Sequence, residues 1–181
     1  MEESSISPQA LSLAGLAVEF CKILAHPSEL APQEFVRECL RYIPRIYISI
    51  ADLKPYEGSG DEAFEEYNTD AISPSVTEEQ YDMVCDDIAR VFGEYDVYLD
   101  TPVEDMRYSD TPVGISLSEQ LGDIFQNMAD FAATMTVSDA ESAGDVLAEL
   151  KYRFHAYLSE TLCSSLRAAN NLYQSRVLSE E

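Results

Sequence analysis

Two pairs of carboxylates in this sequence have the spacing that places both side chains on one face of a helix. Glu119 and Asp123 are four residues apart, and so are Asp82 and Asp86. Helical enzymes that hydrolyse nucleotides or other phosphoesters hold Mg²⁺ with carboxylate pairs of this kind. Such a site also takes carboxylates from two or more helices and a basic group for the phosphate, and residues 46–152 contain only two arginines.

The simpler interpretation is that these acids form the solvated outer faces of their helices, because acidic side chains usually stay exposed unless they are paired. The Asp-x-Asp-x-Asp-Gly run of a calcium loop does not occur. We therefore assign no metal ligand, no catalytic residue and no cofactor. A metal-dependent hydrolase that uses helix carboxylates on a nucleotide or phosphoester remains the alternative function.

Aromatic residues stand in the acidic stretches that we expect to be loops. A tyrosine among carboxylates suits an interface anchor, because it combines a large contact area with a polar tip. The candidate partner-binding residues are Tyr56, Phe64, Tyr67, Tyr95, Tyr98 and Tyr108. The other interpretation is that these rings pin the loops onto the helices.

The cysteines and histidines do not have the spacings of metal or redox sites. No two cysteines lie within three residues of each other, and each falls on the apolar side of a predicted helix. These residues are Cys21, Cys39, Cys85 and Cys163. We expect them to be buried, reduced thiols in a cytoplasmic protein. His26 is expected to end the first helix, and His155 has no second ligand at helical spacing.

Helices must position these residues, because helical periodicity dominates the chain. The first helix starts at a serine–proline cap at residues 7–8 and is apolar almost all round, which predicts a place near the centre of a bundle. A second helix starts at Pro32, is kinked at Pro44 and resumes to about Leu53. The alternative for residues 45–50, a lone strand, would have no partner.

Two further helices have clear boundaries. A capping box at residues 77–80 starts one helix, and Gly93 ends it. The other runs from Leu117 to Met135 with a continuous apolar face. The polar residues expected on its outer face are Glu119, Gln120, Asp123, Gln126, Asn127 and Asp130.

The last helical pattern is unusually long. A capping box at residues 138–141 opens it, and the apolar spacing continues to Val177. One straight helix of that length would measure roughly 60 Å, which is too long for a compact bundle. We expect a bend or break at Ser159 or at the pair Ser164–Ser165.

The chain of 181 residues is long enough for one ordinary domain with a real core. We predict a single-domain, all-α bundle of five to seven helices that spans residues 1–181, with residues 1–7 disordered. Residues 54–76 and 94–115 contain most of the prolines and glycines outside the helices, and they are predicted to be two long, irregular acidic segments.

The negative charge is concentrated in the middle of the sequence. The whole chain has a net charge of −23, and residues 51–150 account for −22 of it, with 25 acidic and three basic residues. Such a surface repels phosphate backbones and anionic membranes, so we expect no direct binding to nucleic acid or membrane. No apolar run approaches the length of a transmembrane helix.

Residues 110–128 resemble a bacterial domain of unknown function. Its members carry the pattern Ser-Leu/Ile-x-x-x-Leu-Ala-Asp-Ile-Tyr-x-Asp after a short acidic, proline-containing stretch. The matching residues are Ser116, Leu117, Leu121, Asp123 and Ile124, and the departures are Gly122, Phe125 and Asn127. The resemblance implies an all-helical fold over about residues 10–175 and supplies no activity. If the pattern has a function in that family, Ser116, Glu119 and Asp123 are the residues that would share it here.

Taken together, these patterns favour a non-catalytic, acidic protein-interaction module. An acidic surface speeds the encounter with a basic partner and aligns it. A basic enzyme that acts on nucleic acid is one such partner, because an acidic patch imitates phosphate. The patterns do not predict an oligomeric state.

Overall fold

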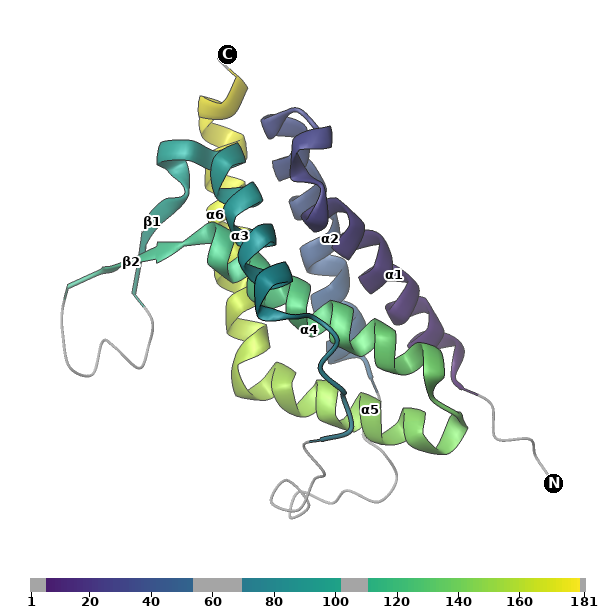
Figure 1. Ribbon diagram of the computed structural model, residues 1–181. Helices are drawn as coiled ribbons and strands as arrows, with labels where there is room; N and C mark the ends of the chain where they lie inside the picture. Colours follow the sequence, from purple (N-terminus) through teal and green to yellow (C-terminus); the bar gives the residue numbers. More distant parts are fainter. Residues whose placement is uncertain (1–5, 54–69, 102–110, 180–181) are drawn as a thin grey trace.

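The fold is an all-α bundle arranged around helix α4, Leu117–Val137 (Figure 1). The computed structural model describes residues 6–53, 70–101 and 111–179. Helix α4 packs against α1 (Pro8–Ala25), α3 (Glu78–Phe92), α5 (Ala140–Arg153) and α6 (Ser159–Ser175), while α2 (Pro32–Ala51) packs on α1 and α6. The predicted all-α class is confirmed.

The predicted helix starts are present, with one shift. Ser7 accepts a hydrogen bond from the Ala10 N–H at the start of α1, and the capping box at residues 77–80 begins α3. The start of α5 lies one residue later than expected, because Asp139 is the capping residue and Ser142 completes the box. Ser138 instead donates its hydroxyl to the Thr134 carbonyl.

Helix α2 continues through Pro44, and no strand forms at residues 45–50. Apolar side chains at helical spacing explain the continuation, because Ile43, Ile46 and Ile50 lie on one side of the helix and are fully buried. The energy of that burial outweighs the one backbone hydrogen bond that a proline removes.

Helix α1 does not lie at the centre of the bundle, so that expectation was wrong. Only one side of it is buried, and Leu11 and Val18 are exposed on the other. The central position belongs to α4, which contacts helices on several sides. Helix α1 is also the one helix within the described ranges that is long and apolar enough to cross a membrane, a test that core helices of soluble proteins meet as well.

The long C-terminal pattern bends at a five-residue π-helical turn, Phe154–Leu158, between α5 and α6. Figure 1 shows the two helices at a large angle to each other. Ser159 follows the turn directly, so one predicted break point lies at its edge and the serine pair at 164–165 lies inside α6. Buried Phe154 fixes the turn, because its ring packs edge-on against Tyr47 of α2.

Part of the predicted irregular segment 94–115 is regular. Strand β1, Val97–Asp100, pairs antiparallel with β2, Val113–Ser116, in the register Val97↔Ser116 to Asp100↔Val113. The hairpin projects from the helical body beside α3 and α6 (Figure 1). Of the other predicted segments, residues 1–5, 54–69 and 102–110 lie outside the described residues, whereas Ile6 and Ser7 are described and lead into α1.

Candidate functional site

The exposed side of α3 and the start of α4 form the most acidic part of the described chain. Its carboxylates belong to Glu78, Glu79, Asp82 and Asp86 of α3 and to Glu119 of α4, and we call this set the acidic surface. All five residues are exposed. Helix α3 carries a single arginine, Arg90, and it pairs with Asp87, outside the set. Among the described residues, none of the five carboxylates has an ion-pair partner.

Helices α3 and α4 meet closely at Gly122. A Cβ atom at this position would lie 2.3 Å from the Cys85 sulfur and 3.2 Å from the Tyr81 ring. Glycine therefore permits a helix approach that a larger residue would hinder. This contact gives a physical reason for one departure from the pattern noted above, where alanine stands at that position.

Asp123 serves this same helix contact. Its Oδ1 accepts a hydrogen bond from the Tyr81 hydroxyl at 2.9 Å. Burial raises the pKa of Asp123, and the bond from Tyr81 partly opposes that shift. Burial and the neighbouring carboxylate also raise the pKa of Tyr81. The pair thus ties α3 to α4, and Glu119, one turn earlier, remains in solvent.

The Cys85 thiol is not activated as a nucleophile. Burial raises the pKa of Cys85 to about 11, with a smaller upward contribution from the carboxylates of Asp123, Glu119 and Asp82 and a partly opposing one from Tyr81. A reactive cysteine needs the opposite shift, since the thiolate is the attacking species.

Only one of the four cysteines is fully buried, so the expectation for the set was too simple. Cys39 is buried and Cys163 is exposed, while Cys21 and Cys85 are half-buried. All four are free. Cys163 lies on the exposed side of α6, away from the apolar face that packs against the bundle.

Ser116 caps the start of α4. Its hydroxyl donates to Asp96 Oδ2 at 2.8 Å and faces the N–H of Glu119 at 3.4 Å. Asp96 also accepts from the backbone and hydroxyl of Ser118, both at 2.8 Å. Of the three residues that would share a function of the family pattern, Ser116 and Asp123 therefore have structural partners within the bundle.

Of the candidate aromatic residues, Tyr95 and Tyr98 are described, and both line a cavity of about 210 Å³ between the hairpin and α6. The Tyr98 hydroxyl donates to Gln120 Oε1 at 2.6 Å, and Gln120 in turn donates to the Ser164 hydroxyl at 2.8 Å. Tyr98 thus pins the hairpin to α4 and α6. Tyr56, Phe64, Tyr67 and Tyr108 lie outside the described residues.

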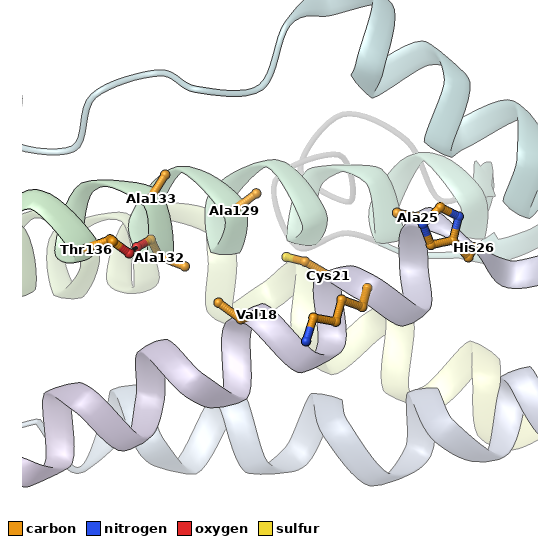
Figure 2. A pocket seen from close by; sticks show the side chains of 9 residues that line it. Val18, Cys21, Ala25, His26, Ala129, Ala132, Ala133 and Thr136 are labelled. Carbon is orange, nitrogen blue, oxygen red and sulfur yellow. Dashed lines mark hydrogen bonds between the residues drawn. The ribbon is translucent and has the colours of Figure 1, made fainter.

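A second hollow, of about 410 Å³, lies between α1 and α4 (Figure 2). Small side chains line it on both helices, including Val18 and Cys21 on α1 and Ala129 and Ala132 on α4. Cys21 donates its thiol to the Phe125 carbonyl, and burial raises its pKa to about 12. The hollow is therefore mostly apolar, and Lys22, His26 and Thr136 also line it.

Two buried carboxylates hold the segment that leads into α3, and one of them, Asp130, was wrongly expected on the outer face of its helix. Asp130 accepts from the backbone N–H groups of Ser75 at 2.6 Å and Val76 at 2.9 Å, and Glu149 accepts from Ile72 N–H at 2.6 Å. Together with Thr134, whose hydroxyl accepts from the backbone of Ser73, they form what we call the α4–α5 clamp.

A metal site of the kind weighed above needs several converging ligands. Within residues 6–53, 70–101 and 111–179, no group of three or more His, Cys, Asp or Glu side chains could hold a metal ion. Glu119 and Asp123 share a helix, but Asp123 is engaged by Tyr81. The described residues therefore add no support to the hydrolase alternative.

Comparison with known proteins gives a family and a fold. Residues 4–175 match the family described as Domain of unknown function (DUF5063). The chain belongs to the DUF5063 family. The expected membership of an uncharacterised domain family is thereby confirmed, and the DUF5063 match supplies no activity. No curated protein matches the chain.

A solved structure has the same architecture as this DUF5063 chain. The crystal structure of protein BF1032 from Bacteroides fragilis, a target of the Northeast Structural Genomics Consortium, is similar with a TM-score of 0.72 and 25% sequence identity. The match covers 92% of each chain. The likeness extends over nearly the whole bundle, and the description of that protein names no function either.

Proposed function

We propose that this protein is a non-catalytic docking module that binds a basic protein through the acidic surface of α3 and α4. The observation that carries the proposal is a row of exposed carboxylates that have no ion-pair partner among the described residues. Glu78, Glu79, Asp82 and Asp86 follow one helix, and Glu119 continues the row on the next. Fields of one sign attract and orient a partner of the opposite sign.

An exposed methionine among these acids supports an interface there. The Met83 side chain is 56% exposed, and it lies on the outer side of α3 one helical turn from Glu79 and from Asp86. Methionine is flexible and polarizable, so it packs against varied partner surfaces. An apolar anchor within a charged rim is the usual arrangement of a binding surface.

The groups that an enzyme would need are engaged elsewhere. Asp123 accepts from Tyr81, Ser116 bonds to Asp96, and the half-buried Cys85 thiol has a raised pKa. These assignments favour a binding role over a catalytic one. A basic enzyme that acts on nucleic acid is the partner class we favour, because a row of carboxylates imitates a phosphate backbone. The four free cysteines fit a cytoplasmic setting.

Affinity purification at two salt concentrations tests the proposal. The tagged chain should recover a basic protein from a lysate at low salt and lose it at high salt, because salt screens exposed charges. Recovery of no protein at either salt concentration would contradict the docking role. A melting experiment with Mg²⁺ or a nucleotide tests the alternative, because a ligand that binds the folded state raises the melting temperature.

A further inference from the structure

The β1–β2 hairpin has one side fixed to the bundle. Tyr98 is bonded to Gln120 of α4, and Asp100 pairs with Arg167 of α6. Because side chains alternate along a strand, these two residues share one face of β1, and their neighbours Val97 and Leu99 share the other. The fixed face gives the hairpin a definite orientation on the bundle.

The opposite face is apolar and lies in solvent. Val97 is 63% exposed and Leu99 is 71% exposed. The register places Gly114 opposite Leu99, so no side chain on β2 covers that leucine from across the sheet. Antiparallel strands usually put polar residues on the solvated face, so two large apolar residues there indicate a contact surface.

The strands also have unused edges. The sheet contains β1 and β2 alone in the described part of the chain, so no third strand pairs with the outer edge of β1 there. A two-stranded sheet is marginally stable alone, and its outer backbone groups are a template for another extended chain. Peptide recognition by strand addition uses such an edge, with backbone bonds for affinity and side-chain contacts for specificity.

We propose that β1 is a docking strand for an extended, basic segment of a partner protein. The segment adds along the outer edge of β1 and places apolar side chains at alternate positions against Val97 and Leu99. This inference rests on the proposed function, because it names the part of the basic partner that reaches the hairpin. Met83 and four of the five carboxylates of the acidic surface lie on α3, which leads through Gly93–Tyr95 into β1.

Charge decides between a basic segment and a second copy of this chain. Exposed Glu94 precedes β1 and exposed Glu119 follows β2, so acids stand at the base of the hairpin. A second copy would bring the same two acids and a net charge of −23 to the contact. Like charges across an interface are unfavourable, whereas a basic partner segment brings charge of the opposite sign to these carboxylates.

Two synthetic peptides test the strand-docking model. One alternates lysine and valine over eight residues, and the other has the same composition with the lysines and valines in two blocks. We expect the alternating peptide to bind about tenfold more tightly, because only its extended form sets every valine on one side. We also expect hydrogen exchange at the β1 amides to slow when it binds, since strand addition protects them.

Variants of the exposed face give the matched control. The double substitution Val97→Thr and Leu99→Thr keeps branched or strand-compatible side chains and removes the apolar contact. It should lower the affinity for the alternating peptide about tenfold and leave the affinity for the block peptide unchanged. Circular dichroism would verify that the fold is retained, which we expect because both side chains are exposed.

Three results would overturn the inference. They are equal binding of the two peptides, unchanged exchange at β1, and a dimer of the chain that the double variant converts to a monomer. A variant that neutralises α3, with Glu78→Gln, Glu79→Gln, Asp82→Asn and Asp86→Asn, separates this inference from the proposed function. If both peptides bind equally and the α3 variant loses both, the acidic surface stands and the docking strand fails. If no partner is recovered from a lysate while the alternating peptide binds β1, the docking strand stands and the proposed function of the acidic surface fails.

Discussion

The carboxylate of Glu149 accepts a hydrogen bond from the backbone N–H of Ile72 at 2.6 Å, although 77 residues separate the two in the chain. Glu149 also accepts from Arg153, and both belong to α5. The neighbouring Lys151 donates to the carbonyls of Ala51 and Leu53 at the end of α2. One helix thus holds both the end of α2 and the segment that leads into α3, and so it helps to set where the acidic surface lies.

Removal of the Glu149 carboxylate should destabilise the fold. Glu149→Ala leaves the Ile72 N–H without its acceptor and Arg153 without its partner, so we expect a loss of about 3 kcal/mol in the free energy of unfolding. Glu149→Gln keeps an acceptor for Ile72 and should lose about half as much. Urea denaturation measures both.

The matched control for this prediction is Asp145→Asn, an exposed acid on the same helix. It should change the free energy of unfolding by less than about 0.5 kcal/mol. An equally small effect for Glu149→Ala would mean that the bond to Ile72 contributes little to the fold.

Gly122→Ala should destabilise the protein even though alanine is the better helix former. The added methyl would lie 2.3 Å from the Cys85 sulfur, and relief of that overlap costs about 1–3 kcal/mol. In a Cys85→Ala background the overlap with sulfur is gone and only the 3.2 Å approach to the Tyr81 ring remains, so the same substitution should change the free energy of unfolding by less than about 1 kcal/mol. Stabilisation by Gly122→Ala in the wild-type background would contradict the close contact of α3 with α4.

The half-buried carboxylate of Asp123 should make the stability of the fold depend on pH in a definite direction. Because burial raises its pKa in the folded state, its contribution to stability is present below the unfolded pKa and is lost as pH rises through the folded pKa. Asp123→Asn does not titrate and can still accept from Tyr81. The melting temperature of this variant relative to wild type should therefore rise between about pH 3 and pH 7.

Melting curves over that pH range test the sign. Asp86→Asn on the exposed side of α3 serves as the control, since it removes one negative charge without touching Tyr81. A relative melting temperature for Asp123→Asn that falls with pH would show that the folded state favours the charged carboxylate.

The helices could be predicted from the sequence because their boundaries are local. Caps, prolines and apolar spacing act within a few residues, and they place α1, α3 and α4 correctly. Even α2 follows the pattern, since three buried isoleucines continue its apolar side past Pro44. The bend near Ser159 follows from length alone, but its form as a π-helical turn depends on how Phe154 packs against Tyr47.

Features that depend on distant segments could not be predicted. Asn127 and Asp130 look like outer residues of an amphipathic helix, but both are buried, so the assignment to the outer face was wrong for them. Asp130 is buried because residues 75 and 76 cross over it and donate their N–H groups. The hairpin pairs two strands whose partner residues are up to 19 positions apart in the sequence. Each strand has only four residues, which is too short for an alternating pattern to be recognised.

The position of α1 shows the same limit. Its sequence is apolar almost all round, yet which side is covered depends on where α2 and α4 lie. The exposed side includes Leu11 and Val18, and the groove of Figure 2 lies between α1 and α4. Among the candidate site residues, Glu119 is exposed as expected, whereas the partners of Ser116 and Asp123 come from distant segments and could not be inferred from local patterns.

Partner recovery by two variants of equal charge tests the central claim most directly. One neutralises α3 with Glu78→Gln, Glu79→Gln, Asp82→Asn and Asp86→Asn. The other neutralises four exposed acids at the end of α2 and on α5 and α6 with Asp52→Asn, Glu141→Gln, Asp145→Asn and Glu160→Gln. We predict that at low salt the first variant recovers about tenfold less of the basic protein than wild type and that the second recovers as much as wild type. Equal losses in the two variants would contradict the account, because net charge rather than the acidic surface of α3 would then determine binding.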